Sequence, residues 1–324
     1  MLPQKSESLL IFSAPSGTII YNKVTKKSYR LGKREYTLFQ ELDGETTIER
    51  LAGKTGFTVD EINNMLGLFD KYTLLAYSDF QIGKDVKKKH TLIYGAPFLQ
   101  VFSNSVLKLA FDFLIFASIP MLVFAIVFMR GKIDVDAMIK SANIFHVIVM
   151  DLILAVSVSL HEVFHAIAAK NNGAFCAEIG YTFDLFVPSA YTTLCGVDEI
   201  KSKWRKIQVF FSGIAANAFI AGISLLMMNV PALRDSLFVF LIFCSNLCLI
   251  LINSITFVKS DVYHILCYLF GNMNLKEDTV KMIKGEGRWN TGNMIYFLIT
   301  YIAEPAIIIK LLIIAFGKIG GKFL

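Results

Sequence analysis

The sequence is poor in charged residues and has no cysteine pattern that would crosslink it. Asp, Glu, Lys and Arg make up 18% of the 324 residues, whereas a soluble globular domain carries about a quarter. The five cysteines are an odd number without a Cys-x-x-Cys pair, which predicts neither a disulfide framework nor a thiolate zinc site. The first ten residues lack the apolar core of a secretory signal, so we expect no cleaved signal and a cytoplasmic N-terminus. These absences argue against a soluble enzyme and against a secreted, disulfide-rich protein.

Hydrophobic residues take the place of the missing charges. They make up 55% of the chain, and a helix needs about 20 of them to cross a bilayer. Lysine and arginine are concentrated in residues 170–206 and 259–293, which lie inside if the N-terminus is cytoplasmic. We therefore predict a multi-pass protein of the cell membrane, with its N-terminus inside and its C-terminus outside. The five predicted spans are Leu107–Met129, Ile144–Ala169, Ile207–Met228, Leu237–Val258 and Met294–Phe316.

The composition changes near residue 90. Residues 1–83 carry charges throughout and predict a small α+β domain in the cytosol. Residues 84–106 predict a basic linker and a segment next to the membrane. Residues 107–324 predict a polytopic helical membrane domain, because a membrane barrel would show short alternating strands instead. The predicted fold class is therefore mainly α: a small N-terminal domain is followed in the sequence by a membrane domain of about five spans.

The second apolar run contains a His-Glu-x-x-His pattern formed by His161, Glu162 and His165. Histidines four positions apart project from the same face of a helix and can bind one zinc ion. The intervening glutamate can take a proton from a water molecule at the metal, as in metal-assisted hydrolysis. Three polar groups buried in an apolar helix without a purpose would be costly. We therefore predict that His161 and His165 are zinc ligands and that Glu162 is the catalytic base.

A tetrahedral zinc site needs a third protein ligand. The predicted topology places the residues after the fourth span on the same side of the membrane as this motif, which leaves Asp261 and His264 as candidates. Asp112 is expected to pair with Lys108 instead. Three other groups are expected to have structural roles: His146 at the membrane interface, Asp151 in a hydrogen bond within the bundle, and Cys244 with Cys248 in packing.

The His-Glu-x-x-His pattern in an apolar helix, followed about a hundred residues later by Asn253 and Asp261, resembles the site-2 protease (M50) family of intramembrane zinc metalloproteases. In that family an Asn is followed by a Pro three residues later and by a zinc-binding Asp eight residues later. This chain has Asn253 and Asp261 at that spacing, with Thr256 where Pro is usual and Val262 where Gly is usual. The resemblance covers about residues 92–316 and implies that Asp261 is the third zinc ligand.

The third run is similar to the family's Gly-Pro-x-x-Asn helix, with Gly213 and Asn217 in place. Asn217 and Asn253 are candidates either for binding the oxyanion or substrate, or for packing between helices. Gly213 and Gly222 are expected to let helices approach closely. Pro305, which follows Glu304 in the last run, is expected to kink that helix, and a role in substrate gating stays open.

Residues 9–80 predict three strands followed by three helices. The strands are expected at Leu9–Ser13, Thr18–Tyr21 and Ser28–Leu31. The helices are expected at residues 33–43, with Gly44 ending the first, then at Thr47–Lys54, and at Val59–Tyr72 behind a Thr58–Glu61 capping box. This order is similar to PqqD-like domains, which are small winged-helix domains that bind the leader of ribosomally made, modified peptides, so the resemblance implies a winged-helix-like fold for residues 1–83. DNA binding and a purely structural role are the alternatives, but the third helix has three acids and one lysine, which argues against DNA.

We therefore predict an intramembrane zinc endopeptidase that cleaves a ribosomally made peptide precursor at the cytoplasmic side. Pro188 and Tyr191-Thr192, followed by the basic residues from Trp204 on, resemble the branch that handles such peptides. Residues 178–187 are expected to offer a strand edge to the substrate, or to form an extended re-entrant loop without a role in substrate binding. The expected partners are the precursor, the bilayer and a peptide-modifying enzyme or exporter, with no nucleic acid. The alternatives are a protease of a membrane-spanning regulator, or a non-catalytic immunity or export protein with a vestigial metal site.

Overall fold

The structure is a computed structural model that describes residues 2–14, 17–78, 89–184 and 187–310. It contains two compact units: Met1–Leu107 with Ala166–Lys201, and Lys108–His165 with Ser202–Leu324. A second sheet, whose strands lie within residues 89–94 and 175–195, therefore belongs to the N-terminal unit. The predicted boundaries after residues 83 and 106 stay a prediction. Most of the predicted basic linker and the end of the fifth predicted span lie outside the described residues.

The N-terminal unit begins with an antiparallel sheet in the order β1 (Leu9–Ala14), β2 (Gly17–Asn22) and β3 (Lys27–Leu31). The three predicted strands are confirmed within one or two residues. The central strand β2 is buried along nearly its whole length, since both faces of the sheet are covered. Ile20 packs against the helices, whereas Ile19 and Tyr21 point to the opposite face, because successive side chains alternate along a strand.

Three helices cover the first face of this sheet: α1 (Lys33–Gln40), α2 (Ile48–Thr55) and α3 (Val59–Lys71). The predicted capping box is present, with the Thr58 hydroxyl accepting from Glu61 N–H and the Glu61 carboxylate accepting from Thr58 N–H. The prediction that Gly44 ends the first helix is wrong. α1 ends at Gln40, and the turn that follows is made by the Asp43 carboxylate, which accepts hydrogen bonds from Glu45 and Thr46.

The second sheet covers the other face of the first and has the order β4 (Lys89–Tyr94), β5 (Phe175–Asp184) and β6 (Val187–Cys195). The buried carboxylate of Glu178 on β5 accepts hydrogen bonds from Lys26 Nζ and from the hydroxyl of Thr91. The expectation that residues 178–187 offer a strand edge is wrong for residues 178–182. β5 is the central strand, and its hydrogen-bonding edges are already occupied by β4 and β6.

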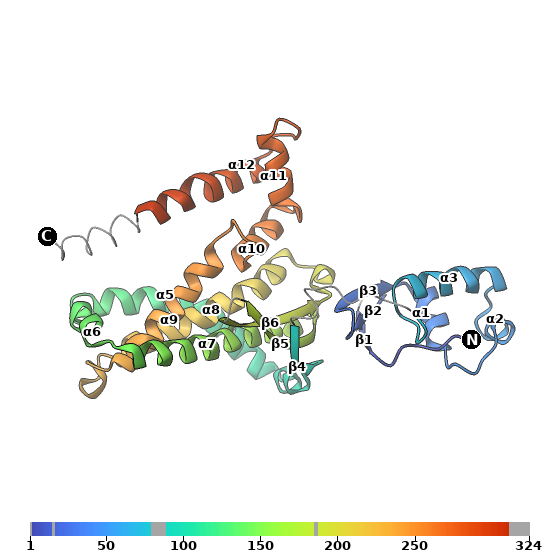
Figure 1. The fold of residues 1–324 in the computed structure, drawn as a ribbon, viewed down its shortest axis with the longest axis horizontal. Helices are drawn as coiled ribbons and strands as arrows, with labels where there is room; N and C mark the ends of the chain where they lie inside the picture. The colour runs from blue at the N-terminus through green and yellow to red at the C-terminus, as the bar shows by residue number, and fades with distance from the viewer. Residues whose placement is uncertain (1, 15–16, 79–88, 185–186, 311–324) are drawn as a thin grey trace. The chain divides into compact units, whose positions relative to one another are not determined.

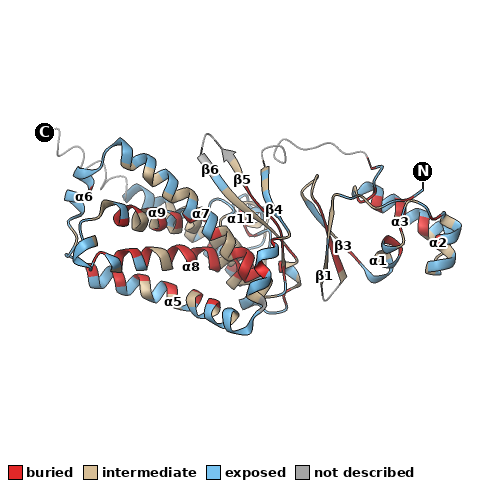
Figure 2. Ribbon diagram, turned by 90° about the horizontal axis from the view of Figure 1, so that it is seen from below, coloured by how far each residue is buried: buried red, intermediate tan, exposed pale blue. Residues whose placement is uncertain are grey.

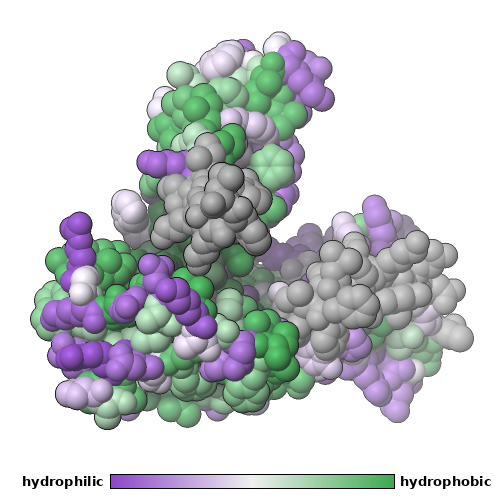
Figure 3. All heavy atoms as spheres, turned by 60° about the vertical axis from the view of Figure 1, so that its left-hand side comes forward, coloured by the Kyte–Doolittle hydropathy of each residue, from purple (hydrophilic) through white to green (hydrophobic). Residues whose placement is uncertain are grey.

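The second unit contains the apolar helices α5 (Ser105–Met129), α7 (Ile144–Asn171), α8 (Lys203–Met227) and α9 (Leu237–Ser254), which run alongside one another (Figure 1). A short helix, α6 (Val135–Ser141), follows α5. α8 buries most of its length, whereas α5 and α7 expose broad faces (Figure 2). These faces carry large apolar side chains such as Phe113, Phe116 and Leu152, and hydrophobic groups cover much of the visible bundle surface (Figure 3). Contact with lipid accounts for such exposure, because a soluble monomer rarely exposes so large an apolar surface.

After α9 in the sequence come α10 (Asp261–Phe270), α11 (Leu275–Ile283) and α12 (Thr291–Phe297). The helix that starts with α12 continues to Lys310 through a π-helical stretch, Leu298–Ala303, directly before Glu304 and Pro305. With this helix the described chain has five helices long and apolar enough to span a membrane. The fold is therefore a helical membrane domain with a small α+β part, as predicted. The fourth span is shorter than expected, because the helix ends at Ser254 and not at Val258.

Candidate metal centre

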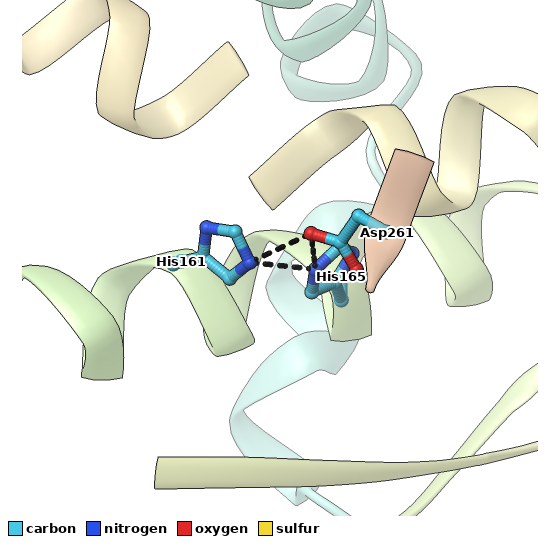
Figure 4. A group of neighbouring side chains, drawn as sticks. All are labelled: His161, His165 and Asp261. Carbon is cyan, nitrogen blue, oxygen red and sulfur yellow. Dashed lines mark hydrogen bonds and ion pairs between the residues drawn. The ribbon is translucent and has the colours of Figure 1, made fainter. Parts of the chain in front are cut away.

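Two buried histidines face the same side of α7. His161 and His165 are one helical turn apart, and their Nε2 atoms lie 3.0 Å from each other. Both point away from their own helix toward α10 (Figure 4). The spacing alone produces this arrangement, since residues four apart lie on one helical face.

Asp261 is the first residue of α10 and completes the group. The hydroxyl of Ser260 caps this helix by accepting from Tyr263 N–H. Oδ2 of Asp261 lies 2.9 Å from His161 Nε2 and 3.2 Å from His165 Nε2. Burial alone would raise the pKa of Asp261, but the adjacent imidazoles of His165 and His161 outweigh it and hold that pKa below its ordinary value. The carboxylate is therefore ionised, as a metal ligand must be.

The three ligand atoms have the separations that one zinc ion requires. Bonds of about 2.0–2.1 Å in a tetrahedron place neighbouring ligand atoms about 3.3 Å apart, and the three separations here are 2.9, 3.0 and 3.2 Å. The space beside the two nitrogens is kept open by Gly213 of α8. A Cβ at that position would lie 2.5 Å from Nε2 of both histidines. The residues present therefore fit a metal ion.

The outer nitrogen of each ring is also held. His165 Nδ1 lies 2.7 Å from the carbonyl oxygen of Val209, so it donates there and leaves Nε2 free to bind a metal. His161 Nδ1 faces the amide nitrogen of Asn217 at 2.9 Å, and the amide oxygen has no hydrogen-bond partner among the described residues. A half-turn of the amide places that oxygen against Nδ1–H and gives His161 the same arrangement.

The comparison with known families bears on this group directly. Residues 149–309 match the family model of peptidase family M50. The chain contains an M50 domain. No curated protein and no solved structure matches the chain. The M50 match indicates intramembrane metalloprotease activity and a multi-pass membrane protein, because the matched segment contains the whole His–His–Asp group and most of the apolar helices.

Within the M50 domain, the geometry separates the two candidates for the third ligand. His161, His165 and Asp261 are the only group of three possible metal ligands among the residues the structure describes. The ring of His264 instead stacks on that of Phe210, with centroids 4.8 Å apart. Glu162 follows His161 directly and is half-buried. Its role as catalytic base stays a prediction.

The two asparagines differ in their surroundings. Asn217 is fully buried beside His161, whereas Asn253 donates to the carbonyl of Leu249 in its own helix. Their roles toward an oxyanion or substrate stay predictions.

Gly222 allows close packing of α8 against α5 as expected, because a Cβ there would lie 3.2 Å from the Leu122 backbone.

Three other predicted groups lie outside the metal centre. The Asp112 carboxylate accepts hydrogen bonds from Arg205 and Gln208 of α8, two partners that were not predicted, and its expected ion pair with Lys108 stays a prediction. Asp151 is exposed on α7 and makes no hydrogen bond with the described residues, so the expected bond within the bundle is wrong. His146 lies at the start of α7, with Nδ1 2.8 Å from Asn143 Oδ1.

Sequence reasoning missed two contributions to this centre. It explained Gly213 by helix packing alone, although the Cβ-free position also preserves the space at the histidines. It did not assign the Val209 carbonyl, since a backbone group gives no sequence signal. The position of Gly213 four residues before Asn217, on one helical face, is the signal that was available.

Proposed function

We propose that the chain is a zinc endopeptidase whose site lies near the cytoplasmic side of the membrane. The observation that carries the proposal is the triangle of His161, His165 and Asp261 around the space that Gly213 keeps open. Two imidazoles and one carboxylate form a donor set that suits zinc and leaves a fourth position for water or substrate.

The chain's own residues supply the other parts of a hydrolytic reaction. Val209 holds the ring of His165, and Asn217 holds that of His161, so both ligands are oriented before the metal binds. Zinc, when bound, polarises the scissile carbonyl and favours ionisation of water at neutral pH. Glu162 accepts the proton of the attacking water and returns it to the leaving amine.

Replacing the proposed base separates metal binding from chemistry. The Glu162→Gln protein is expected to bind zinc like the unchanged protein and to lose cleavage of a quenched-fluorescent peptide library. Metal analysis and the cleavage rate check the two expectations. An undiminished rate would show that Glu162 is not the base. A wild-type zinc content far below one per chain would instead favour the vestigial, non-catalytic alternative.

The proposed substrate is a ribosomally made precursor peptide whose leader binds the PqqD-like domain, residues 1–83, in the cytosol. Among the described strands β3 pairs only with β2, so one of its edges can accept an added strand. Beside it, the ring of Tyr29 lies 4.9 Å from that of Tyr72 on α3. Leu68 and Tyr72 are 48% and 38% exposed, which provides an apolar surface for side chains of a bound peptide. The PqqD-like order of the elements supports the same proposal.

Point substitutions test leader binding better than removal of residues 1–89. Deletion would leave the Glu178 carboxylate buried without Lys26 and would disturb the second sheet. Leu68→Asp is expected to weaken binding of short precursor peptides encoded beside the gene. The matched control is Ile11→Asp, because Ile11 is 46% exposed on the opposite edge strand. Equal binding by both variants and the unchanged protein would favour a membrane-spanning regulator as the substrate.

A further inference from the structure

The loop that leads to Asp261 is hydrogen-bonded to the fifth span by a buried residue, Thr256. Its N–H and its hydroxyl both donate to Glu304 Oε1, each at 2.7 Å. Its carbonyl oxygen accepts a hydrogen bond of 2.9 Å from the hydroxyl of Tyr296. The hydroxyl of Thr300 lies within hydrogen-bond distance of that of Thr256. All three polar groups of Thr256 are therefore bonded to one helix.

The three partners follow a regular spacing along that helix. Tyr296, Thr300 and Glu304 are each four residues apart, so they form one polar stripe in an otherwise apolar span. The π-helical stretch Leu298–Ala303 lies between the first and the last of them, and π-helical turns are often found at functional sites. Thr256 and Thr300 are buried, so this polar stripe is directed into the protein.

Thr256 occupies the position where the M50 resemblance has proline. A proline has no N–H and fixes the backbone before it in an extended conformation. Here Ile255 is extended without a proline, with φ −73° and ψ 111°. Threonine brings a buried N–H and a buried hydroxyl, which are costly unless they are paired. Glu304 pairs both, so its carboxylate compensates for the missing proline.

The fifth span also contacts the helix that begins with Asp261. The ring of Tyr296 packs edge-on against that of Tyr263, with centroids 5.9 Å apart. Tyr263 lies two residues after Asp261 and is almost fully buried. On the other side of the loop, Lys276 of α11 donates to the carbonyl of Phe257 at 2.8 Å. The position of Asp261 therefore depends on attachments at both ends of a short loop.

We propose that Tyr296, Thr300 and Glu304 position Asp261 for metal binding through Thr256, with Glu304 as the main positioning residue. This inference rests on the proposed zinc site. Glu304 acts through the loop and not on the substrate, so the quantity that it controls is metal affinity. Removing a direct hydrogen-bond partner of a ligand weakens metal binding by about 10- to 100-fold, and we expect an effect of this order for Glu304, which fixes the loop before the ligand.

Zinc affinity of the purified full-length chain, measured by competition with a chelator, tests the proposal. Glu304→Ala is expected to weaken binding about 10- to 100-fold. Thr256→Pro combined with Glu304→Ala is expected to regain most of that affinity, because proline needs no acceptor. The control Ile302→Ala changes an exposed residue of the same helix and is expected to leave the affinity unchanged.

The outcomes distinguish this inference from the proposed function. Zinc binding by the unchanged chain, with equal affinity in Glu304→Ala, would overturn the positioning role and leave the zinc site standing. A double variant as weak as Glu304→Ala would overturn the compensation by proline. If the unchanged chain binds no zinc, the proposed function fails and this inference fails with it. Rescue by proline would also show that Glu304→Ala had not simply unfolded the protein.

Discussion

Two carboxylates, the fully buried Glu178 and the partly buried Asp261, lie one in each unit and have different neighbours. Glu178 in the N-terminal unit accepts from Lys26 and from the hydroxyls of Thr91 and Thr193. Asp261 in the membrane unit instead faces the ring nitrogens of His161 and His165, both within 3.2 Å. The ammonium group of Lys26 gives Glu178 a fixed positive partner, whereas histidines that bind a metal are neutral, so an ion held by this group would supply the charge that balances Asp261.

This difference indicates which carboxylate is structural. Glu178 is fully buried and its partners come from the chain itself, so it joins the two sheets of its unit. The group around Asp261 brings three potential donors to a metal ion together beside a space from which a side chain is missing. A buried acid beside a lysine therefore suits a role in stabilising the fold, whereas a carboxylate beside two histidines and a glycine suits the binding of a cation.

Filling the space at the histidines gives the largest expected effect. In Gly213→Ala the new Cβ would lie 2.5 Å from both Nε2 atoms, so we expect zinc content to fall to background and cleavage to stop. Gly222→Ala is the matched control on the same helix. Its Cβ would approach Met121 and Leu122 of α5, which strains helix packing but leaves the histidines untouched. Equal zinc content in the two variants would contradict the assignment of this space to the ion.

Removing the charge of Glu178 is expected to affect folding and not zinc. Glu178→Gln leaves Lys26 buried without a counter-charge, which costs about 3–5 kcal/mol of unfolding free energy. The control Glu199→Gln removes an ion pair with Arg30, whose side chain is 55% exposed, and should cost less than about 1 kcal/mol. Denaturation of the two purified variants checks the expectation. If Glu178→Gln lost zinc without losing stability, Glu178 would not have the purely structural role that distinguishes it from Asp261.

The ion pair of Glu178 with Lys26 also predicts that the folding stability falls at acidic pH. Burial alone would raise the pKa of Glu178, but hydrogen bonds from Lys26 and Thr91 outweigh it and lower the pKa. A group with a lowered pKa stabilises the folded state above its unfolded pKa, about 4.3 for Glu, and loses this contribution as the pH falls through the folded pKa. The stability difference between the unchanged protein and Glu178→Gln should therefore shrink below about pH 4. A difference that stays constant down to pH 2 would contradict the shift.

A smaller effect on zinc is expected from the amide behind His161. Asn217→Leu keeps the volume of the side chain but removes the contact with Nδ1, so zinc affinity should fall about 10- to 100-fold. Asn246→Leu is the matched control, since its buried amide donates to Ser157 and not to a proposed ligand. Equal zinc affinity in the two variants would show that Asn217 only packs between helices and does not orient His161.

The sequence predicted the features that depend on local spacing. The spans follow from run length, the strands and α3 from alternation and capping, and His161 with His165 from one helical turn. Asp261 was predicted from its distance to Asn253 in a family motif, and the structure brings it to the histidines. The spans, the strands, α3 and the two histidines are each encoded within a single segment, so one sequence is enough to find them, whereas Asp261 needed the predicted topology and the family motif as well.

Contacts between distant segments were not predictable in this way. The central position of β5, the pairing of Asp112 with α8 and the link from Thr256 to Glu304 each join residues far apart in the chain. The four-residue spacing of Tyr296, Thr300 and Glu304 was visible, but its partner was not, because no local rule connects it to a loop 40 residues earlier. Gly213 was explained by packing for the same reason.

Zinc content of the purified full-length chain, compared with that of Asp261→Ala, tests the central claim most directly. We expect about one tightly bound zinc per unchanged chain, and a zinc content near background in Asp261→Ala after dialysis. A chain that retains zinc equally well without this carboxylate, or an unchanged chain that binds none, would contradict the account.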